Sequence, residues 1–220
     1  MRTTEGDKLA REGRTVLGIG AVFLLFSLVQ HWWIAAVILA VFLLFSLYFF
    51  RNPTRVPKGR EEDVLSPADG KIVQNEIVYD DRYLKRRCHK IGIFMSIFDV
   101  HVNRVPLSGT VQAIEYHPGK FISATRDKAS DDNEQNALII KKENGISVAV
   151  VQIAGLIARR IVCYPIVGTR VERGAIFGMI KFGSRLDVYL PEKSKIHIQM
   201  GEKVRAGETI IATLPGKVDA

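Results

Sequence analysis

The chain is organised around one segment, Lys181-Phe182-Gly183-Ser184-Arg185-Leu186-Asp187-Val188-Tyr189-Leu190-Pro191. Apolar side chains at positions 188 and 190 alternate with those at 187 and 189, which predicts a short strand that ends at the proline. Gly183-Ser184 is the only Gly-Ser dipeptide in the sequence. Glycine lets the backbone adopt conformations that other residues resist, which brings the serine hydroxyl close to the glycine carbonyl. This geometry suits an N→O acyl shift, although most Gly-Ser pairs are simple turns.

Length and charge narrow the class of protein. The 220 residues allow one soluble domain with an appendage, or two small domains. Two cysteines, Cys88 and Cys163, give no disulfide framework and are expected to be reduced core residues. A net charge of +8 allows nucleic acid or anionic lipid as a partner.

The first apolar region favours lipid. Residues Val16–Phe50 are almost wholly apolar, with an interruption at Gln30-His31-Trp32-Trp33. A single helix of this length would exceed a bilayer core, which needs roughly 20 residues. The interruption predicts a hairpin of two helices, Val16–Val29 and Ile34–Phe50, with the tryptophans at an interface. A cleaved signal peptide is disfavoured because no small-residue cleavage site follows, and a buried core hairpin is the remaining alternative.

Positive charge flanks the hairpin on both sides, which predicts that both ends lie in the cytoplasm. The basic residues are Lys8, Arg11 and Arg14 before it, and Arg51, Arg55, Lys58 and Arg60 after it. We therefore expect a cytoplasmic segment at 1–15, a membrane hairpin at 16–50 and a basic linker at 51–64 near anionic headgroups. No nucleic-acid-binding motif follows, so we expect no nucleic-acid partner.

From residue 65 to residue 220 the pattern is of short strands and turns, which predicts a mostly β domain with some α structure. Ala154–Val162 fits a helical turn or an irregular strand, and Lys128–Gln135 fits a loop. The other expected strands are Lys71–Tyr79, His89–Ser96, Thr110–Tyr116, Ala137–Lys142, Ser147–Ile153, Lys195–Met200 and Glu208–Leu214.

One internal repeat has the form G-x-x-V-x-x-G before an apolar segment. It occurs at Gly168–Gly174 and again at Gly201–Gly207. The pattern resembles the turns of biotinyl/lipoyl-type β domains, so we expect lipoyl-like repeats in the fold. Asp127-Lys128-Ala129 imitates a lipoyl attachment triplet, but it lies in a long polar region rather than at the tip of an apolar hairpin.

Five further residues are candidates for chemistry. Asp69 lies in the turn Pro67-Ala68-Asp69-Gly70, where a turn aspartate bonded to its own backbone is the plainer interpretation. Asp99 and His101 share a face of an extended segment, so the carboxylate can orient the imidazole as a base. Arg104 could bind a phosphate, and His117 is a second candidate base within a His-Pro-Gly turn. No cluster has the spacing of a metal site.

Five segments occur in the order Ser66-Pro67-Ala68-Asp69-Gly70, Phe94–Pro106, Tyr116–Phe121, Asn133-Glu134-Gln135-Asn136 and Gly178–Pro191. Taken together and in this order, they resemble the short bacterial and archaeal form of phosphatidylserine decarboxylase. The resemblance runs from about position 49 to the C-terminus, and a preceding hydrophobic hairpin is usual for that form.

The resemblance implies a proenzyme that cleaves itself between Gly183 and Ser184 and makes a covalent pyruvoyl cofactor from Ser184. Chains 1–183 and 184–220 would stay together as a heterodimer, with a higher oligomer left open. The substrate amine would form a Schiff base with the pyruvoyl ketone, lose carbon dioxide and leave as an ethanolamine lipid. The expected location is the cell membrane, with the catalytic domain facing the cytoplasm.

The same resemblance implies roles for individual residues. Asp69 would assist self-cleavage, Asp99 and His101 match the family's Asp-x-His, and His101 would transfer a proton during decarboxylation. The longer form of the family has a second histidine where this chain has Arg104, so the base for self-cleavage is open between His101 and His117.

Two other functions remain open at this point. One is the same reaction on an ether lipid, archaetidylserine, which shares the head group. The other is a membrane-tethered lipoyl- or biotinyl-like carrier, for which Gly183-Ser184 would be only a turn. The carrier hypothesis predicts an intact chain with a modified lysine.

Overall fold

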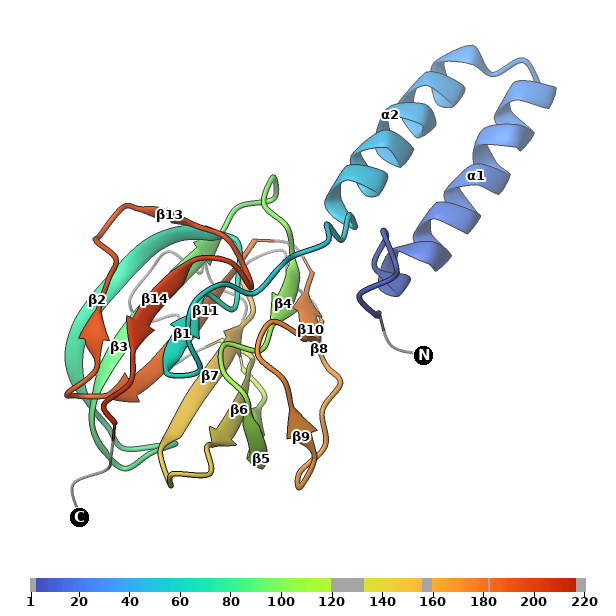
Figure 1. The fold of residues 1–220 in the computed structure, drawn as a ribbon. Coiled ribbons are helices and arrows are strands. Elements are labelled where there is room, and N and C mark those ends of the chain that lie inside the picture. The colour runs from blue at the N-terminus through green and yellow to red at the C-terminus, as the bar shows by residue number, and fades with distance from the viewer. Residues whose placement is uncertain (1–2, 120–132, 156–159, 182, 217–220) are drawn as a thin grey trace. The chain divides into compact units, whose positions relative to one another are not determined.

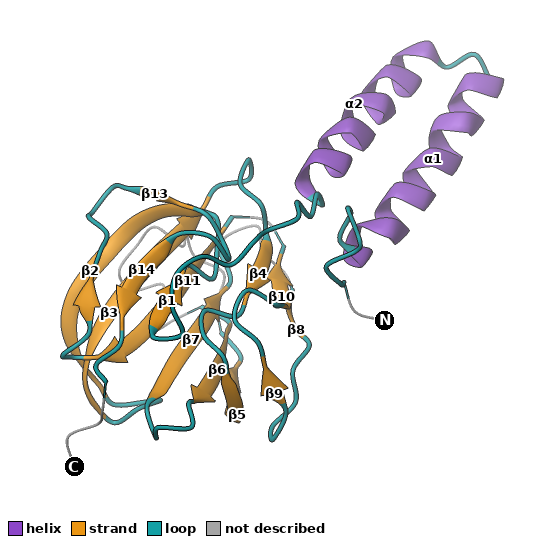
Figure 2. Ribbon diagram, viewed as in Figure 1, coloured by secondary structure: helices purple, strands orange, loops and turns teal. Residues whose placement is uncertain are grey.

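The computed structural model describes residues 3–119, 133–155, 160–181 and 183–216 (Figure 1). The chain divides into two compact units, Met1–Thr54 and Arg55–Ala220. The first is helical and the second is built of strands, as Figure 2 shows. The predicted class, mostly β with some α structure, is confirmed.

The first unit is a pair of antiparallel helices. A 3-10 turn at Arg11–Gly13 leads into α1 (Arg14–Val29), and α2 (Trp33–Phe49) follows a short turn. His31 in that turn has a φ of 56°, a left-handed conformation that reverses the chain. The two predicted helices are therefore confirmed.

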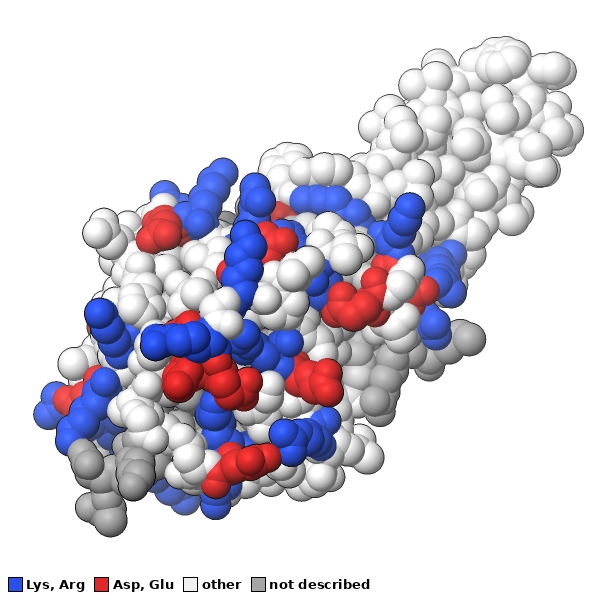
Figure 3. Space-filling model, in the orientation of Figure 1, with Lys and Arg blue, Asp and Glu red and all other residues white. Residues whose placement is uncertain are grey.

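Both helices are apolar on every side. The helical residues Arg11–Val29 are numerous and apolar enough to cross a membrane, while Trp33–Phe49 is somewhat shorter. Large apolar side chains stay exposed along both helices, and in Figure 3 these helices carry almost no charged atoms. Exposed apolar surface on this scale is characteristic of a site of membrane or protein contact.

The N-terminal segment closes the open end of the hairpin. The amide of Ala10 donates to the Phe50 carbonyl at 2.7 Å, and the amide of Asn52 donates to the Lys8 carbonyl at 2.8 Å. Lys8 and Arg51 therefore lie at the same end of the hairpin. A shared end is what the positive charge on both flanks of the hairpin predicted.

The second unit contains fourteen strands among the described residues, and these strands pair in antiparallel fashion. An eight-stranded sheet has the order β13-β2-β3-β11-β7-β6-β5-β9, and two three-stranded sheets have the orders β1-β14-β12 and β4-β10-β8. The long strands β2 and β3 curve strongly (Figure 2). The strands are β1 (Asp63–Leu65), β2 (Gly70–Asp80), β3 (Arg86–Met95), β4 (Val102–Arg104), β5 (Gly109–His117), β6 (Gln135–Lys141), β7 (Ser147–Ile153), β8 (Ile161–Cys163), β9 (Arg170–Val171), β10 (Ile176–Ile180), β11 (Ser184–Pro191), β12 (Lys195–Ile196), β13 (Lys203–Val204) and β14 (Ile210–Thr213).

Strand β11 lies in the middle of the large sheet, between β3 and β7. Leu186, Val188 and Leu190 point into the main core, while Tyr189 belongs to a smaller apolar cluster on the opposite face. The large sheet is thus covered on both faces at β11, and every residue from 184 to 190 is buried. We call these two sides the main-core face and the second face.

Most expected strands are confirmed, because their alternating apolar positions match β2, β3, β5, β6, β7, β11 and β14. Lys195–Met200 was predicted too long, since β12 ends at Ile196. Ala154–Val162 is described only in part: Ile161–Cys163 forms β8, and residues 156–159 lie outside the described residues. The expected loop Lys128–Gln135 is also described only in part: β6 begins at its last residue, Gln135, and residues 128–132, with Lys128, lie outside the described residues.

The expected lipoyl-like repeats are not confirmed. The glycines that begin and end both repeats have φ near +80°, so the shared pattern does encode the same kind of tight turn. The strands within the repeats, β9 and β13, form opposite edges of the large sheet. The strands that follow, β10 and β14, belong to two different small sheets. The repeat is therefore one of local turns.

Candidate active site

Gly183 and Ser184 lie at the junction between β10 and β11. Gly183 has a φ of +39°, and a Cβ at this position would meet no atom of the described residues within 4 Å, its chain neighbours apart. Ser184 is fully buried, and its Oγ has no hydrogen-bond partner among the described residues. Leaving a buried hydroxyl unbonded costs about 1–3 kcal/mol. The hydroxyl is therefore available for a reaction partner.

Ser184 is fixed laterally as the first residue of β11. It pairs with Met95, the last residue of β3, and the next residue pairs with both β3 and β7. Because side chains alternate along a strand, Ser184 shares the main-core face with Leu186. The cleavage site that the sequence predicted therefore lies at the N-terminal end of the central strand.

Asp69 approaches the end of β3 from the neighbouring strand β2. A side chain at Gly70 would collide with the carbonyl oxygen of Phe94, so glycine is required for the turn to come this close. Phe94 precedes Met95, the partner of Ser184. The turn that holds Asp69 therefore lies at the same end of β3 as the Gly183–Ser184 step.

The Asp69 carboxylate is largely buried and well bonded. It accepts a hydrogen bond from the Ala206 amide and one from the Arg55 guanidinium, each at 2.7 Å. Burial nevertheless raises the pKa of Asp69 above its usual range, because it outweighs these two contacts, and the charge of Asp99 raises it further. A carboxyl with a raised pKa is characteristic of a group that exchanges protons.

His101 is fully buried, and its imidazole is oriented by the backbone. Nδ1 lies 3.0 Å from the carbonyl oxygen of Asp99. A carbonyl can only accept, so Nδ1 carries the hydrogen and the neutral ring has its lone pair on Nε2. The Asp99 carboxylate instead accepts from the amide and hydroxyl of Ser96, both at 2.8 Å. The expected carboxylate–imidazole contact is thus replaced by a carbonyl contact, while the carboxylate fixes the preceding turn.

A chain of buried polar side chains connects β4, which begins directly after His101, to β3 and β7, the two neighbours of β11. The Asn103 side chain lies 3.7 Å from Sδ of Met95, and its oxygen accepts from Nε2 of Gln152 at 2.9 Å. Gln152 also donates to the Val162 carbonyl and accepts from the Asn136 side chain, both at 3.2 Å. We call these four side chains, of Met95, Asn103, Gln152 and Asn136, the buried amide chain. Sequence analysis missed it, although the polar residues inside apolar strands were a visible signal.

His117 lies elsewhere. It pairs with Gln135, which pairs with Ile153, which in turn pairs with Arg185. Three strand spacings of about 4.8 Å therefore separate its backbone from β11. Ile153 belongs to the second apolar cluster, so His117 points to the second face, where it is exposed and 3.8 Å from Glu115. The structure does not bring His117 to Ser184.

Arg104, the candidate phosphate-binding residue, does not lie on the surface. It is almost fully buried, and its guanidinium donates to the Gly174 carbonyl at 2.9 Å. Its backbone amide donates to the Pro67 carbonyl, which ties β4 to the Asp69 turn. Arg104 therefore holds the Asp69 turn and the Gly174 turn together.

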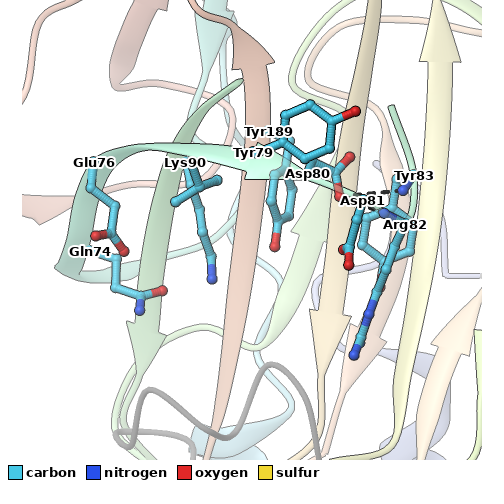
Figure 4. A pocket seen from close by; sticks show the side chains of 10 residues that line it. Gln74, Glu76, Tyr79, Asp80, Asp81, Arg82, Tyr83, Lys90 and Tyr189 are labelled. Carbon is cyan, nitrogen blue, oxygen red and sulfur yellow. Dashed lines mark hydrogen bonds between the residues drawn. The ribbon is translucent and has the colours of Figure 1, made fainter. Parts of the chain in front are cut away.

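A pocket of about 270 Å³ opens on the second face rather than beside Ser184 (Figure 4). It lies between the segment Tyr79–Tyr83 and the side chains of Lys90 and Tyr189, and none of the predicted site residues lines it. Among the described residues, no group of three or more His, Cys, Asp or Glu side chains could hold a metal ion.

The fold and site define a two-part protein, in which an apolar helical hairpin accompanies a β unit with a buried Gly-Ser step at its central strand. Residues 42–212 match the family model for phosphatidylserine decarboxylase. The chain is 46% identical over 208 residues to a phosphatidylserine decarboxylase proenzyme of Syntrophus aciditrophicus, covering 93% of this chain and 97% of that protein. It is 44% identical over 207 residues to the proenzyme of the same name from Geotalea uraniireducens, covering 94% and 97%.

The chain belongs to the phosphatidylserine decarboxylase family. The similarity extends over most of the chain, and the sequence identity is higher than a shared fold alone requires. The matched residues include Gly183 and Ser184. The carrier hypothesis, which needed lipoyl-like repeats, loses its support.

Proposed function

We propose that this protein decarboxylates phosphatidylserine to phosphatidylethanolamine with a pyruvoyl group made from its own Ser184. Family membership supports the reaction, and the relatives are named proenzymes, which implies processing. The observation that supports the site is the buried Ser184 hydroxyl, which lacks a partner among the described residues and follows a glycine with positive φ.

Self-cleavage begins when Oγ of Ser184 attacks the carbonyl carbon of Gly183. The peptide C–N bond breaks, the hydroxyl proton passes to the released nitrogen, and an ester joins the two residues. Loss of the Cα proton of residue 184 then expels the Gly183 carboxylate and leaves dehydroalanine. Tautomerisation, addition of one water and loss of one ammonia give the terminal ketone. The products are chains 1–183 and 184–220.

His101 and Asp69 are the groups that we assign to these proton transfers. Nε2 of His101 carries the lone pair in the neutral ring, because Nδ1 donates to the Asp99 carbonyl. It can take the proton from Oγ of Ser184 and return it to the departing nitrogen. Asp69, with its raised pKa, can then hold the proton that leaves Cα. The alternative base, His117, has no support because it lies on the opposite face of the sheet.

The pyruvoyl ketone would supply the electron sink that the departing carboxylate of the substrate needs. The buried position of Ser184 fits such a group, since electrostatic effects are strongest where water is excluded. After carbon dioxide leaves, Nε2 of His101 would give the substrate carbon a proton that it had first taken from the substrate's ammonium group. Asp99 keeps His101 in place through its backbone carbonyl.

The hairpin supports the delivery of a lipid substrate. Its exposed apolar helices would anchor the protein in the cell membrane, with the basic residues at the shared end on the cytoplasmic side. Archaetidylserine has the same head group, so we propose that assays include both lipids to separate the two substrates.

The experiment that tests this proposal is the denatured intact mass of the purified protein and of Ser184→Ala. We expect the unchanged protein to give two chains, the smaller one with a ketone in place of its N-terminal amine. We expect Ser184→Ala to give one chain near 24.6 kDa without decarboxylase activity. Ser194→Ala is the matched control, because Ser194 is also buried with no partner for its Oγ among the described residues, but it does not follow a glycine. Activity in Ser184→Ala, or an unchanged protein of a single mass with full activity, would refute the pyruvoyl proposal.

A further inference from the structure

Directly behind the proposed cleavage step lies a buried ion pair that the reaction described above does not use. Nε of Arg185 lies 2.8 Å from Oδ1 of Asp187, and a second guanidinium nitrogen lies 3.0 Å from Oδ2. The two side chains are 1% and 0% exposed. Nζ of Lys90, on the neighbouring strand β3, lies 3.3 Å from the same carboxylate.

This pair lies on the second face of β11, while Ser184 lies on the main-core face. Arg185 and Asp187 are two residues apart on one strand, which is why their side chains meet. Burying two charges costs several kcal/mol per ion before their attraction is counted. A hydrophobic pair would cover the sheet at lower cost, so stability alone does not explain this arrangement.

We propose that the Arg185–Asp187 pair positions the new chain end after self-cleavage, so that the pyruvoyl carbonyl stays where the intact chain held Ser184. This inference rests on the proposed function. Before cleavage, residue 184 is held by peptide bonds on both sides. Afterwards it is a chain terminus, and termini fray unless they are tied down.

Arg185 is the residue that can tie the new terminus down. Its backbone pairs with Phe94 on one side and Ile153 on the other. Its side chain is held by the two-point contact with Asp187, two residues further from the end, and a two-point contact fixes orientation as well as distance. A lateral shift of residue 185 would move the adjacent carbonyl, and a misplacement of 1 Å can reduce catalysis by ~10²-fold.

The proposal predicts that the pair is dispensable for cleavage and required for turnover. We would test this with Asp187→Asn in the full-length protein, which keeps the shape of the side chain and removes its charge. Glu192→Gln is the matched control, since Glu192 pairs with Arg87 at 3.0 Å across the far end of the same two strands, in solvent.

Four quantities would be measured for each variant. They are the fraction cleaved by intact mass, the ketone content by hydrazine labelling, the turnover per ketone, and the hydrogen exchange of the amides at the start of the small chain. For Asp187→Asn we expect cleavage and ketone content near those of the unchanged protein, with turnover per ketone lower by ~10- to 100-fold. We also expect faster exchange at the first amides of the small chain. Glu192→Gln should change none of the four.

Unchanged turnover per ketone and unchanged amide exchange in Asp187→Asn would overturn the inference. Loss of cleavage in parallel with turnover would also overturn it, because the pair would then act before the chain is cut. If Asp187→Asn does not fold, Arg185→Lys replaces it, since lysine keeps the charge but not the two-point contact, and the same outcomes apply. Failure of the proposed function itself is recognised separately, because the unchanged protein would then carry no ketone.

Discussion

The buried amide chain gives the sharpest stability prediction, and its test is Asn103→Leu. Leucine has a similar size, but it removes the oxygen that accepts from Nε2 of Gln152 at 2.9 Å. Among the described residues, Gln152 then keeps only the Val162 carbonyl, at 3.2 Å, as an acceptor for its two N–H groups. One buried N–H is then unpaired, which costs about 1–3 kcal/mol. For a chain of this size each kcal/mol lowers Tm by about 2–4 °C, so the expected fall is about 2–12 °C.

The measurement is thermal unfolding in the Ser184→Ala background, where the chain stays in one piece and the transition is not complicated by cleavage. Gln112→Leu in the same background is the control, because Gln112 is exposed and its side chain accepts a hydrogen bond from the Ser147 hydroxyl at the surface. Surface changes of this kind fall within about 0.5 kcal/mol. If the Asn103→Leu protein unfolded at the same temperature as its parent, the claim that the buried amide chain stabilises the fold would be refuted.

The same substitution reports on function when Ser184 is restored. Asn103 is two residues after His101 and touches Met95, the strand partner of Ser184. If the amide chain sets the distance between base and nucleophile, Asn103→Leu slows self-cleavage as well, by up to ~10²-fold for a displacement near 1 Å. Cleavage at the normal rate in a protein with lowered Tm would separate the two roles and confine the amide chain to stability.

The remaining predictions concern the proton-transfer groups. His101→Ala should lower decarboxylation by ~10²-fold or more, measured as carbon dioxide released per ketone, and near-normal turnover would remove His101 from the site. Asp69→Asn should slow self-cleavage, measured by the appearance of the small chain over time, and an unchanged rate would exclude Asp69 as a proton acceptor. Because burial raises the pKa of Asp69 above the ordinary value for an aspartate, acidification should abolish cleavage at a higher pH than it would with an ordinary aspartate. Arg55 favours the charged form of the Asp69 carboxylate, so Arg55→Gln should move the loss of cleavage to a still higher pH. Arg205→Gln is the control and should leave the pH of this loss unchanged, because the Arg205 side chain is exposed. A shift to lower pH in Arg55→Gln would contradict the stabilising effect of Arg55 on the carboxylate.

Much of the fold could be predicted from local sequence. Alternation of apolar residues located β2, β3, β5, β6, β7 and β11, because a strand buried on one or both faces shows that alternation directly. The end of β12 could not be found this way. Its expected continuation is interrupted by a turn in which the Glu202 side chain bonds the Gln199 amide, and that contact overrides the apolar pattern.

The site could be predicted only as far as its local motifs reach. Gly183-Ser184 was visible because the chemistry needs adjacent residues, and the Asp-x-His motif because its members are two apart. The location of His117 was not visible, since the face it occupies depends on the register of four strands. The lipoyl-like repeat failed for the same reason, because glycine turns alone do not specify which strands pair.

The position of the proposed cut within the sheet explains how a chain could be broken there and remain folded. Strand β11 is paired along its whole length with β3, and over five residues with β7, so its place does not depend on the peptide bond that precedes it. The later strands reinforce this, since β13 pairs with β2 and β14 pairs with β1, both from the part of the chain before residue 183. Cutting elsewhere in β11 would divide a paired strand, whereas cutting before its first residue releases only the connection from β10. The break would then cost little stability, and the strand pairings together with the proposed role of the Arg185–Asp187 pair would keep the freed end at the end of β3 that the Asp69 turn approaches.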